Sequence, residues 1–162
     1  MTLTPESIVD TSLEVLSQFG MGDLSMRRLA RELQVQPSAL YWHVKNKQEL
    51  FVLIAQRFTA EVDARCPASA RPTPAVTCLA LRDVLLAYRD GAEIFTLAYS
   101  LQPETVIPEA LATALESQSL AVLLSFVLGQ LMIEQNRSLL DVADDSAEDT
   151  FAAGLTALLR AT

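Results

Sequence analysis

Two short helical patterns separated by a tight break occupy residues 25–47, and they constrain the fold more than any other feature of the chain. The first pattern places Met26, Leu29, Ala30 and Leu33 on one helical face, at the spacing of an amphipathic helix. The second starts at Gln36-Pro37, because proline suits the first position of a helix, and extends to about His43. Two short helices joined by a break of about three residues predict a helix-turn-helix.

The rest of the chain also predicts helices. Leu and Ala are abundant, the 162 residues include only 5 Gly, and runs of β-branched residues are short, so we expect an all-α protein. Thr4 and Pro5 predict the start of the first helix, and Gly20 its end. Helical spacing predicts helices over residues 5–19, 25–33, 36–43, 46–64, 75–88, 91–101, 108–116, 119–140 and 151–159, with an acidic loop over 141–149.

Proline marks the domain organisation. Residues 66–74 (CPASARPTP) contain three prolines and cannot be helical throughout, so they form a junction. We expect an N-terminal three-helix helix-turn-helix domain over residues 1–46 and a C-terminal helical domain over residues 47–162. Residues 47–65 are expected to form a connecting helix.

The chain is acidic overall, with a net charge of −8, but its charge is unevenly distributed. Residues 24–48 carry five basic side chains and one acidic side chain, whereas the segment from Pro67 onward carries five basic and twelve acidic ones. A basic patch can attract phosphate despite an acidic body, since exposed charges are screened beyond about 10 Å at ordinary salt. The segment that holds the two short helices is therefore the one suited to nucleic acid.

Cysteine usage and hydropathy indicate where such a chain works. Cys66 and Cys78 have no metal-binding spacing, and no signal peptide precedes them, so we expect a reducing cytoplasm. The longest apolar stretch, Leu120 to Leu128, is well short of the roughly 20 residues that span a bilayer. We therefore expect no membrane partner.

The second short helix has the side chains that a DNA-reading helix needs. Gln36, Ser38 and residues 41–43 project from the face opposite the apolar one, and Tyr41 and Lys47 can bind phosphates. Two alternatives stay open: Trp42 could be a core residue, and His43 could cap its helix. A metal role for His43 is disfavoured, because the chain has no second histidine.

The order LARELQVQPSALYWHVKNKQEL (residues 29–50) resembles the DNA-binding domain of the tetracycline-repressor (TetR) family of bacterial transcriptional regulators. The resemblance covers about Pro5 to Phe58, and the YWHVKNK string is its most specific part. Residues 88–92 (YRDGA) and the segment around 126–135 show a weaker resemblance to the family's ligand-binding and dimerising domain.

The resemblance implies roles for individual residues. Arg27 becomes the base contact from the first helix of the motif, and Lys47 becomes a phosphate contact. The recognition helix is implied to present Pro37, Ser38, Ala39, Tyr41, Trp42 and His43. Gln34 departs from the family, which often has Gly at this turn because the position needs positive φ. We expect Gln34 to cost some strain without abolishing the turn.

One helix-turn-helix covers only a few base pairs, so we expect a homodimer on a palindromic operator, with half-sites roughly 34–36 Å apart. The family pairs its last two long helices in a four-helix bundle, and Ser119–Leu131 and Phe151–Leu159 are apolar enough for that role. The small residues Ala152, Ala153 and Gly154 would allow close approach. The alternative is that both segments are ordinary core helices.

The family also implies a small-molecule site between the middle helices. The candidates are Leu86, Phe95, Tyr99, Leu111, Leu115 and Gln118, with Arg82 or Arg89 for polarity. Tetracycline repressors hold a magnesium–drug chelate with a pocket histidine, and this chain has no histidine after His43. We therefore expect a different, apolar effector and no metal or other cofactor.

These observations predict a DNA-binding regulator, a repressor that an apolar ligand releases from a palindromic operator. The alternative is a dimeric DNA-binding adaptor that senses no ligand. The sequence contains no GxSxG, P-loop, HExxH or GxGxxG motif and no Cys/His cluster, so we expect no enzymatic activity.

Overall fold

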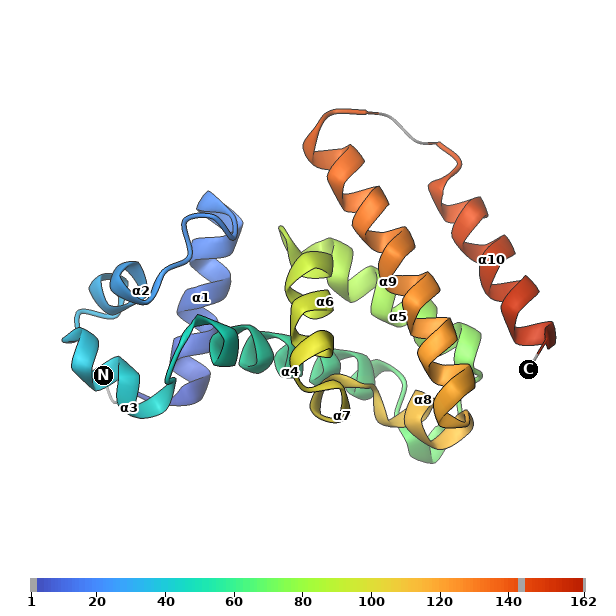
Figure 1. Cartoon of the computed structure of the whole chain (residues 1–162), viewed down its shortest axis with the longest axis horizontal. Coiled ribbons are helices and arrows are strands. Elements are labelled where there is room, and N and C mark those ends of the chain that lie inside the picture. Colours follow the sequence, from blue (N-terminus) through green and yellow to red (C-terminus); the bar gives the residue numbers. More distant parts are fainter. Residues whose placement is uncertain (1–2, 143–144, 162) are drawn as a thin grey trace. The chain divides into compact units, whose positions relative to one another are not determined.

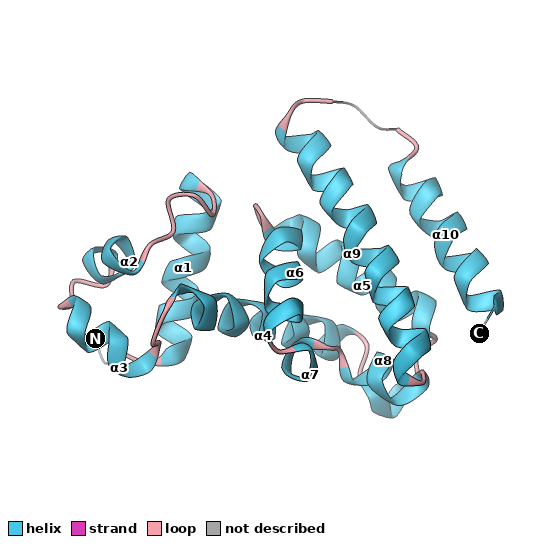
Figure 2. Ribbon diagram, viewed as in Figure 1, coloured by secondary structure: helices cyan, strands magenta, loops and turns pink. Residues whose placement is uncertain are grey.

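The computed structural model describes residues 3–142 and 145–161, and every regular element in that part of the chain is a helix (Figures 1 and 2). The all-α prediction is confirmed. In chain order the elements are α1 (Pro5–Phe19), α2 (Met26–Glu32), α3 (Pro37–His43), α4 (Lys47–Arg65), the 3-10 turn η1 (Ala68–Ala70), α5 (Pro74–Ala87), α6 (Gly91–Leu101), α7 (Pro103–Val106), α8 (Glu109–Ala114), α9 (Ser117–Leu139) and α10 (Ala147–Ala161).

The predicted loop over residues 141–149 is wrong at its C-terminal end, because α10 already begins at Ala147. Glu148 and Asp149 lie in the first turn of α10, where carboxylates favour the positive end of the helix dipole. The run of acidic residues therefore predicted a loop, although its last residues form the first turn of a helix. Residues 143–144 of the predicted loop lie outside the described part. The four-residue helix α7 was not predicted.

Contacts divide the chain into two compact units. Unit 1 comprises residues 1–58 and 87–106, and unit 2 comprises residues 59–86 and 107–162. The N-terminal helices thus share a unit with α6 and α7, and the division falls inside α4. The boundary expected at residues 46–47 stays a prediction.

Unit 1 is built on α1, whose start follows from local chemistry. The Thr4 side chain accepts a hydrogen bond from the Ser7 amide, and the Ser7 hydroxyl accepts one from the Thr4 amide, which makes a capping box. Ile8 and Leu16 on α1 are buried. They belong to the buried core of unit 1, which fixes α2 and α3. Other members of this core are Leu24, Leu29, Leu40, Leu50, Ile54, Phe58, Ile94 and Phe95.

Unit 2 contains the hairpin of α9 and α10, which run side by side in Figure 1. Phe126 of α9 stacks on Phe151 of α10, with ring centroids 6.0 Å apart. A Cβ added to Gly154 would overlap the Phe126 ring. Of the three small residues predicted to allow close approach, Gly154 is therefore the one whose missing side chain leaves room for a neighbouring helix.

Helix α9 is long and apolar enough to cross a membrane by length and composition, with a mean hydropathy of 1.4 over its best window. The sequence prediction missed this, because it counted only the uninterrupted apolar run. The core helix of a globular protein meets the same criterion. Leu124, Val127 and Leu131 on α9 are buried within one copy of the chain, and 33% of the apolar window is buried in all.

The two cysteines are buried as free thiols. Burial raises the pKa of Cys78 to about 12, because the apolar surroundings disfavour the thiolate. A thiol in this state reacts slowly, since the thiolate is the reactive form.

Candidate nucleic-acid interface

The turn between α2 and α3 has the geometry that its sequence predicts. Gln34 adopts φ = 55°, so the expectation of positive φ at this position is confirmed. The Val35 amide donates to the Ala30 carbonyl at 2.9 Å and the Gln34 amide to the Arg31 carbonyl at 3.1 Å, which is the Schellman ending of a helix. These bonds hold Gln34 in a conformation that costs a non-glycine residue roughly 1 kcal/mol.

Helix α3 turns almost all of its side chains to solvent. Leu40 is the only buried residue among its seven, and Val44, directly after it, is buried too. Trp42 is 89% exposed and Tyr41 48% exposed, which excludes the alternative that Trp42 belongs to the core. Gln36, Pro37, Ser38 and His43 are also exposed, whereas Ala39 is half-buried. Leu40 and Val44 therefore anchor the helix while the predicted contact residues face outward.

Helix α2 carries three arginines in different environments. Ser25 caps the helix by accepting a hydrogen bond from the Arg28 amide at 3.2 Å. The Arg28 guanidinium lies 3.6 Å from the centre of the Phe19 ring and pairs with Asp23 at 3.3 Å. Arg28 is thus committed to contacts within unit 1. In the sequence, Glu32 follows Arg28 by one helical turn, and this spacing favours an ion pair within the helix.

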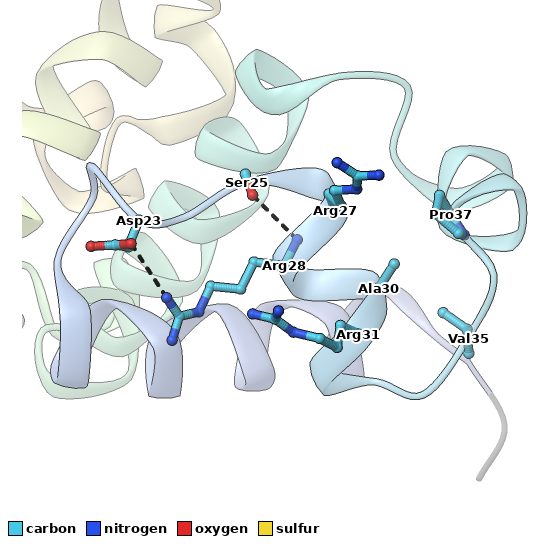
Figure 3. A pocket seen from close by; sticks show the side chains of 8 residues that line it. All are labelled: Asp23, Ser25, Arg27, Arg28, Ala30, Arg31, Val35 and Pro37. Carbon is cyan, nitrogen blue, oxygen red and sulfur yellow. Dashed lines mark hydrogen bonds and ion pairs between the residues drawn. The ribbon is translucent and has the colours of Figure 1, made fainter.

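Arg27 and Arg31 are exposed, and they line an open recess of about 460 Å³ that Figure 3 shows from close by. In that view the Arg27 guanidinium points away from Arg28 and Arg31. Val35 and Pro37 complete the recess from the turn and from the start of α3. An exposed guanidinium beside the start of α3 is suited to a phosphate or a base edge.

Lys47, the first residue of α4, is half-buried. Its Nζ atom donates to the Met21 carbonyl at 3.2 Å and lies 5.4 Å from the centre of the Phe51 ring. In this structure the ammonium group therefore has a partner within the protein. A phosphate contact would have to share or replace that bond.

The predicted ligand residues are distributed over both units. Phe95, fully buried, and Tyr99, half-buried, lie on α6 in unit 1. Arg82 and Leu86 lie on α5 in unit 2, where Arg82 pairs with Glu134 through two bonds of 2.6 and 3.2 Å. Leu111 on α8 is fully buried in unit 2, and Arg89 in unit 1 donates to the Gln18 carbonyl at 3.5 Å.

Leu115 and Gln118 line a recess of about 250 Å³ in unit 2. The other residues of this recess, which are Ser119, Val122, Leu123, Leu158 and Leu159, were predicted to belong to the dimerising helices and not to the ligand site. Leu158 and Leu159 could have been found only by placing α10 against α9. Among residues 3–142 and 145–161, no three His, Cys, Asp or Glu side chains gather as a metal-binding group.

Comparison with known proteins agrees with this geometry. The family described as "Bacterial regulatory proteins, tetR family" matches residues 8–54, which span α2, the turn and α3. The crystal structure of Mycobacterium smegmatis BioQ has 31% sequence identity and a TM-score of 0.83, over 99% of this chain and 97% of BioQ. The chain belongs to the TetR family.

Two further relatives of this TetR-family chain bear on function. BioQ with its natural double-stranded DNA operator has 29% identity and a TM-score of 0.79, over 99% of this chain and 98% of BioQ. The class D tetracycline repressor of Escherichia coli is 36% identical over 96 residues, which make up 57% of this chain and 44% of the repressor. The match therefore spans less than half the length of that curated relative.

Membership of the TetR family confirms two predictions. The family consists of regulators and not of enzymes, so the chain is not an enzyme. The resemblance first seen in residues 29–50 extends to the fold of the whole chain, because BioQ matches both units.

Proposed function

We propose that this chain is a homodimeric, DNA-binding transcriptional regulator that works in the cytoplasm. In this proposal it represses transcription from a palindromic operator, and a small apolar ligand releases it. The recognition surface comprises Arg27, Gln36, Pro37, Ser38, Ala39, Tyr41, Trp42, His43 and Lys47.

The observation that carries the DNA-binding proposal is the exposure of Tyr41 and Trp42 on a rigidly anchored short helix within a basic segment. Exposed aromatic side chains cost free energy in water, so their presence favours a partner that covers them. The nearby cations Arg27, Arg31 and Lys45 favour a polyanion as that partner. BioQ, which is similar over its whole length, binds a double-stranded DNA operator.

The dimer proposal draws on α9 and α10. Val122 and Ile133 on α9 are each about half exposed within one copy of the chain, and Ala152, Ala153 and Ala157 are exposed on α10. Aliphatic and small side chains suit a second copy of the same face, because they allow two helix pairs to pack closely. The cations of these helices, Arg137 and Arg160, lie in their last turns.

The effector proposal draws on the recess that includes Leu115 and Gln118, which is lined mainly by leucine and valine side chains. A tetracycline repressor responds, by its name, to tetracycline. This chain has no histidine after His43 to help hold a magnesium chelate. We therefore propose an apolar effector that needs no metal.

A second candidate function is a dimeric DNA-binding adaptor that senses no ligand. Its support is the size of the recess: about 250 Å³ is below the roughly 300–1,000 Å³ of most ligand pockets. The two candidates share the DNA-binding surface and differ only in the response to a ligand.

Selection of bound sequences from a random DNA pool tests the DNA-binding proposal. We expect a palindrome whose half-sites lie roughly 34–36 Å apart, because two recognition helices related by a two-fold axis fit that spacing. Enrichment of no sequence above the starting pool would refute the proposal.

Operator release by small molecules separates the two candidates. Tetracycline with Mg²⁺ and the uncharged apolar dye N-phenyl-1-naphthylamine serve as probes against the selected operator. The effector proposal expects release by the apolar probe and none by the magnesium chelate, whereas the adaptor expects no release by either. Release by the chelate alone would contradict the proposed class of effector.

A further inference from the structure

The loop that joins α1 to α2 contains two glycines, Gly20 and Gly22, in the segment GMGDL. Glycine has more backbone freedom than other residues, so such a loop would be loosely ordered if nothing else held it. Leu24 at its end is fully buried, and Ser25 directly after it caps α2. The conformation of this loop therefore determines where α2, and the turn and α3 after it, begin.

Two side chains from distant parts of unit 1 hold the backbone of Met21 in this loop. The Met21 amide donates to Oδ2 of Asp90 at 2.6 Å, across 69 residues of sequence. The Met21 carbonyl accepts from Nζ of Lys47 at 3.2 Å. It also accepts from the Leu24 amide at 3.3 Å, which closes the turn of the loop. One residue is thus held at both polar groups of its backbone by charged side chains.

The loop and the segment around Asp90 fit closely together. A Cβ on Gly20 would lie 2.9 Å from Oδ2 of Asp90 and 3.0 Å from Nε of Arg89. Gly20 also has φ = 78°, so it is required both for its conformation and for this approach. The neighbouring Tyr88 is held by its ring, which lies 4.7 Å from that of Phe58.

Asp90 itself occupies a strained position. It has φ = 58°, in the left-handed region where Gly or Asn is preferred and where Asp is only tolerated. Its side chain makes no cap hydrogen bond to α6, whose N-terminus it precedes. The bond to Met21 therefore gives a reason for an aspartate here that the local conformation does not.

We infer that Asp90 is a positioning residue for the DNA-binding surface, and that together with Lys47 it clamps Met21 and so fixes the start of α2. The inference rests on the proposed function for its consequence on DNA, but the clamp itself can be measured without DNA. Residues 88–92 resembled the family's ligand-binding domain in sequence. The inference gives this segment a positioning role within unit 1.

The test compares Asp90→Gly with Asp90→Asn in the full-length chain. Glycine suits the left-handed conformation, so D90G keeps the backbone conformation and loses the acceptor together with its negative charge. Asparagine keeps an oxygen that can accept from the Met21 amide. Asp10→Asn is the matched control, because Asp10 forms an exposed ion pair with Arg57 in the same unit and its loss changes the net charge equally.

The first readout is amide hydrogen exchange over residues 20–24 in the absence of DNA. We expect faster exchange in D90G and near-normal exchange in D90N and D10N. Unchanged exchange in D90G overturns the clamp, whatever the DNA measurements give.

The second readout is affinity for DNA selected by the wild-type chain, titrated over a range of salt concentrations. We expect D90G to bind about tenfold more weakly, as for loss of one charge-assisted hydrogen bond, with rescue in D90N. The slope of log affinity against log salt should stay unchanged, because no phosphate contact is lost. Faster exchange with unaltered affinity overturns the positioning role. If the wild type binds no selected DNA, the proposed function and this role fall together, while the exchange data still decide the clamp.

Discussion

Helices α3 and α9 both leave apolar side chains exposed, but the exposed residues differ in kind. Helix α3 exposes Tyr41 and Trp42, large amphipathic rings in a segment (residues 24–48) that carries five exposed or half-buried cations. Helix α9 exposes Val122 and Ile133, which are aliphatic, and the partner helix α10 adds small residues.

The difference shows how the chemistry around an exposed apolar patch indicates its partner. Aromatic rings beside cations suit a polyanion with flat bases and sugars, as in nucleic acid. Aliphatic and small side chains suit a second apolar helix, which needs only close packing, and the cations of α9 and α10 lie only in their last turns. In the proposed function, α3 therefore meets DNA, whereas α9 and α10 meet a second copy of the chain.

The largest effect is expected from Ile133→Arg, which places a charge on the proposed dimer face. Burying an unpaired charge between two copies is costly, so we expect a monomer by analytical ultracentrifugation. DNA affinity should fall by about 10²-fold or more, because the second half-site contact is lost. Val76→Arg is the control: Val76 on α5 is 49% exposed, close to the 51% of Ile133. A dimeric I133R would remove this face of α9 from the interface.

The α3 side of the comparison is tested by Tyr41→Ala and Lys47→Ala. Both should weaken binding to the selected operator by about tenfold and leave the dimer intact. The salt slope distinguishes two roles for Lys47: it becomes shallower by about one if Nζ binds a phosphate, and it stays unchanged if Nζ only holds Met21. Gel-shift titration measures both quantities. Unaltered binding in either variant would exclude that residue from the interface.

A smaller effect, on stability, is expected from Gly154→Ala. The added Cβ overlaps the Phe126 ring, so α9 and α10 must move apart or Phe126 must leave its stacking on Phe151. Overpacking of this kind costs about 1–3 kcal/mol. Gly129→Ala on α9 is the matched control, since nothing lies within 4 Å of its added Cβ, and it should stabilise the helix slightly. Urea denaturation compares them, and equal stabilities would contradict this packing.

The smallest effect is expected from Gln34→Gly in the turn before α3. Glycine relieves the left-handed strain at φ = 55° but adds freedom to the unfolded chain, so we expect a gain of at most about 1 kcal/mol. Gln36→Gly, at φ = −70°, has no strain to relieve and should destabilise the protein slightly. Thermal unfolding of the pair tests the sign. Destabilisation by Q34G would show that the Gln34 side chain makes a compensating contribution.

Much of the DNA-binding surface could be predicted because its signals are local. Ser25 as a cap, Pro37 at the start of α3, and the spacing of Leu29, Leu40 and Val44 each depend on residues within one or two helical turns. The expectation of positive φ at Gln34 came instead from the family resemblance, because members often have Gly at this turn. Short-range rules therefore sufficed for α2 and α3.

The remainder depends on contacts between segments far apart in sequence. The acidic run is an exception, because carboxylates in a first helical turn are a local signal and the loop prediction overlooked it. A count of charges does not show which cations have partners within the protein. In the structure Arg28 stacks on Phe19, and Lys47 donates to the Met21 carbonyl. No spacing rule pairs Arg82 with Glu134, since α5 and α9 meet only in the folded unit.

The sequence by itself determined an all-helical chain with a helix-turn-helix of the TetR family and a proline-rich junction, because helix caps, turns and amphipathic spacing are encoded over a few residues. Only the tertiary structure decided which cations are exposed, that Gly154 makes room for Phe126, and that Asp90 lies against the Met21 amide. These depend on how close two helices or loops approach, and side-chain packing sets that distance after the local elements have formed.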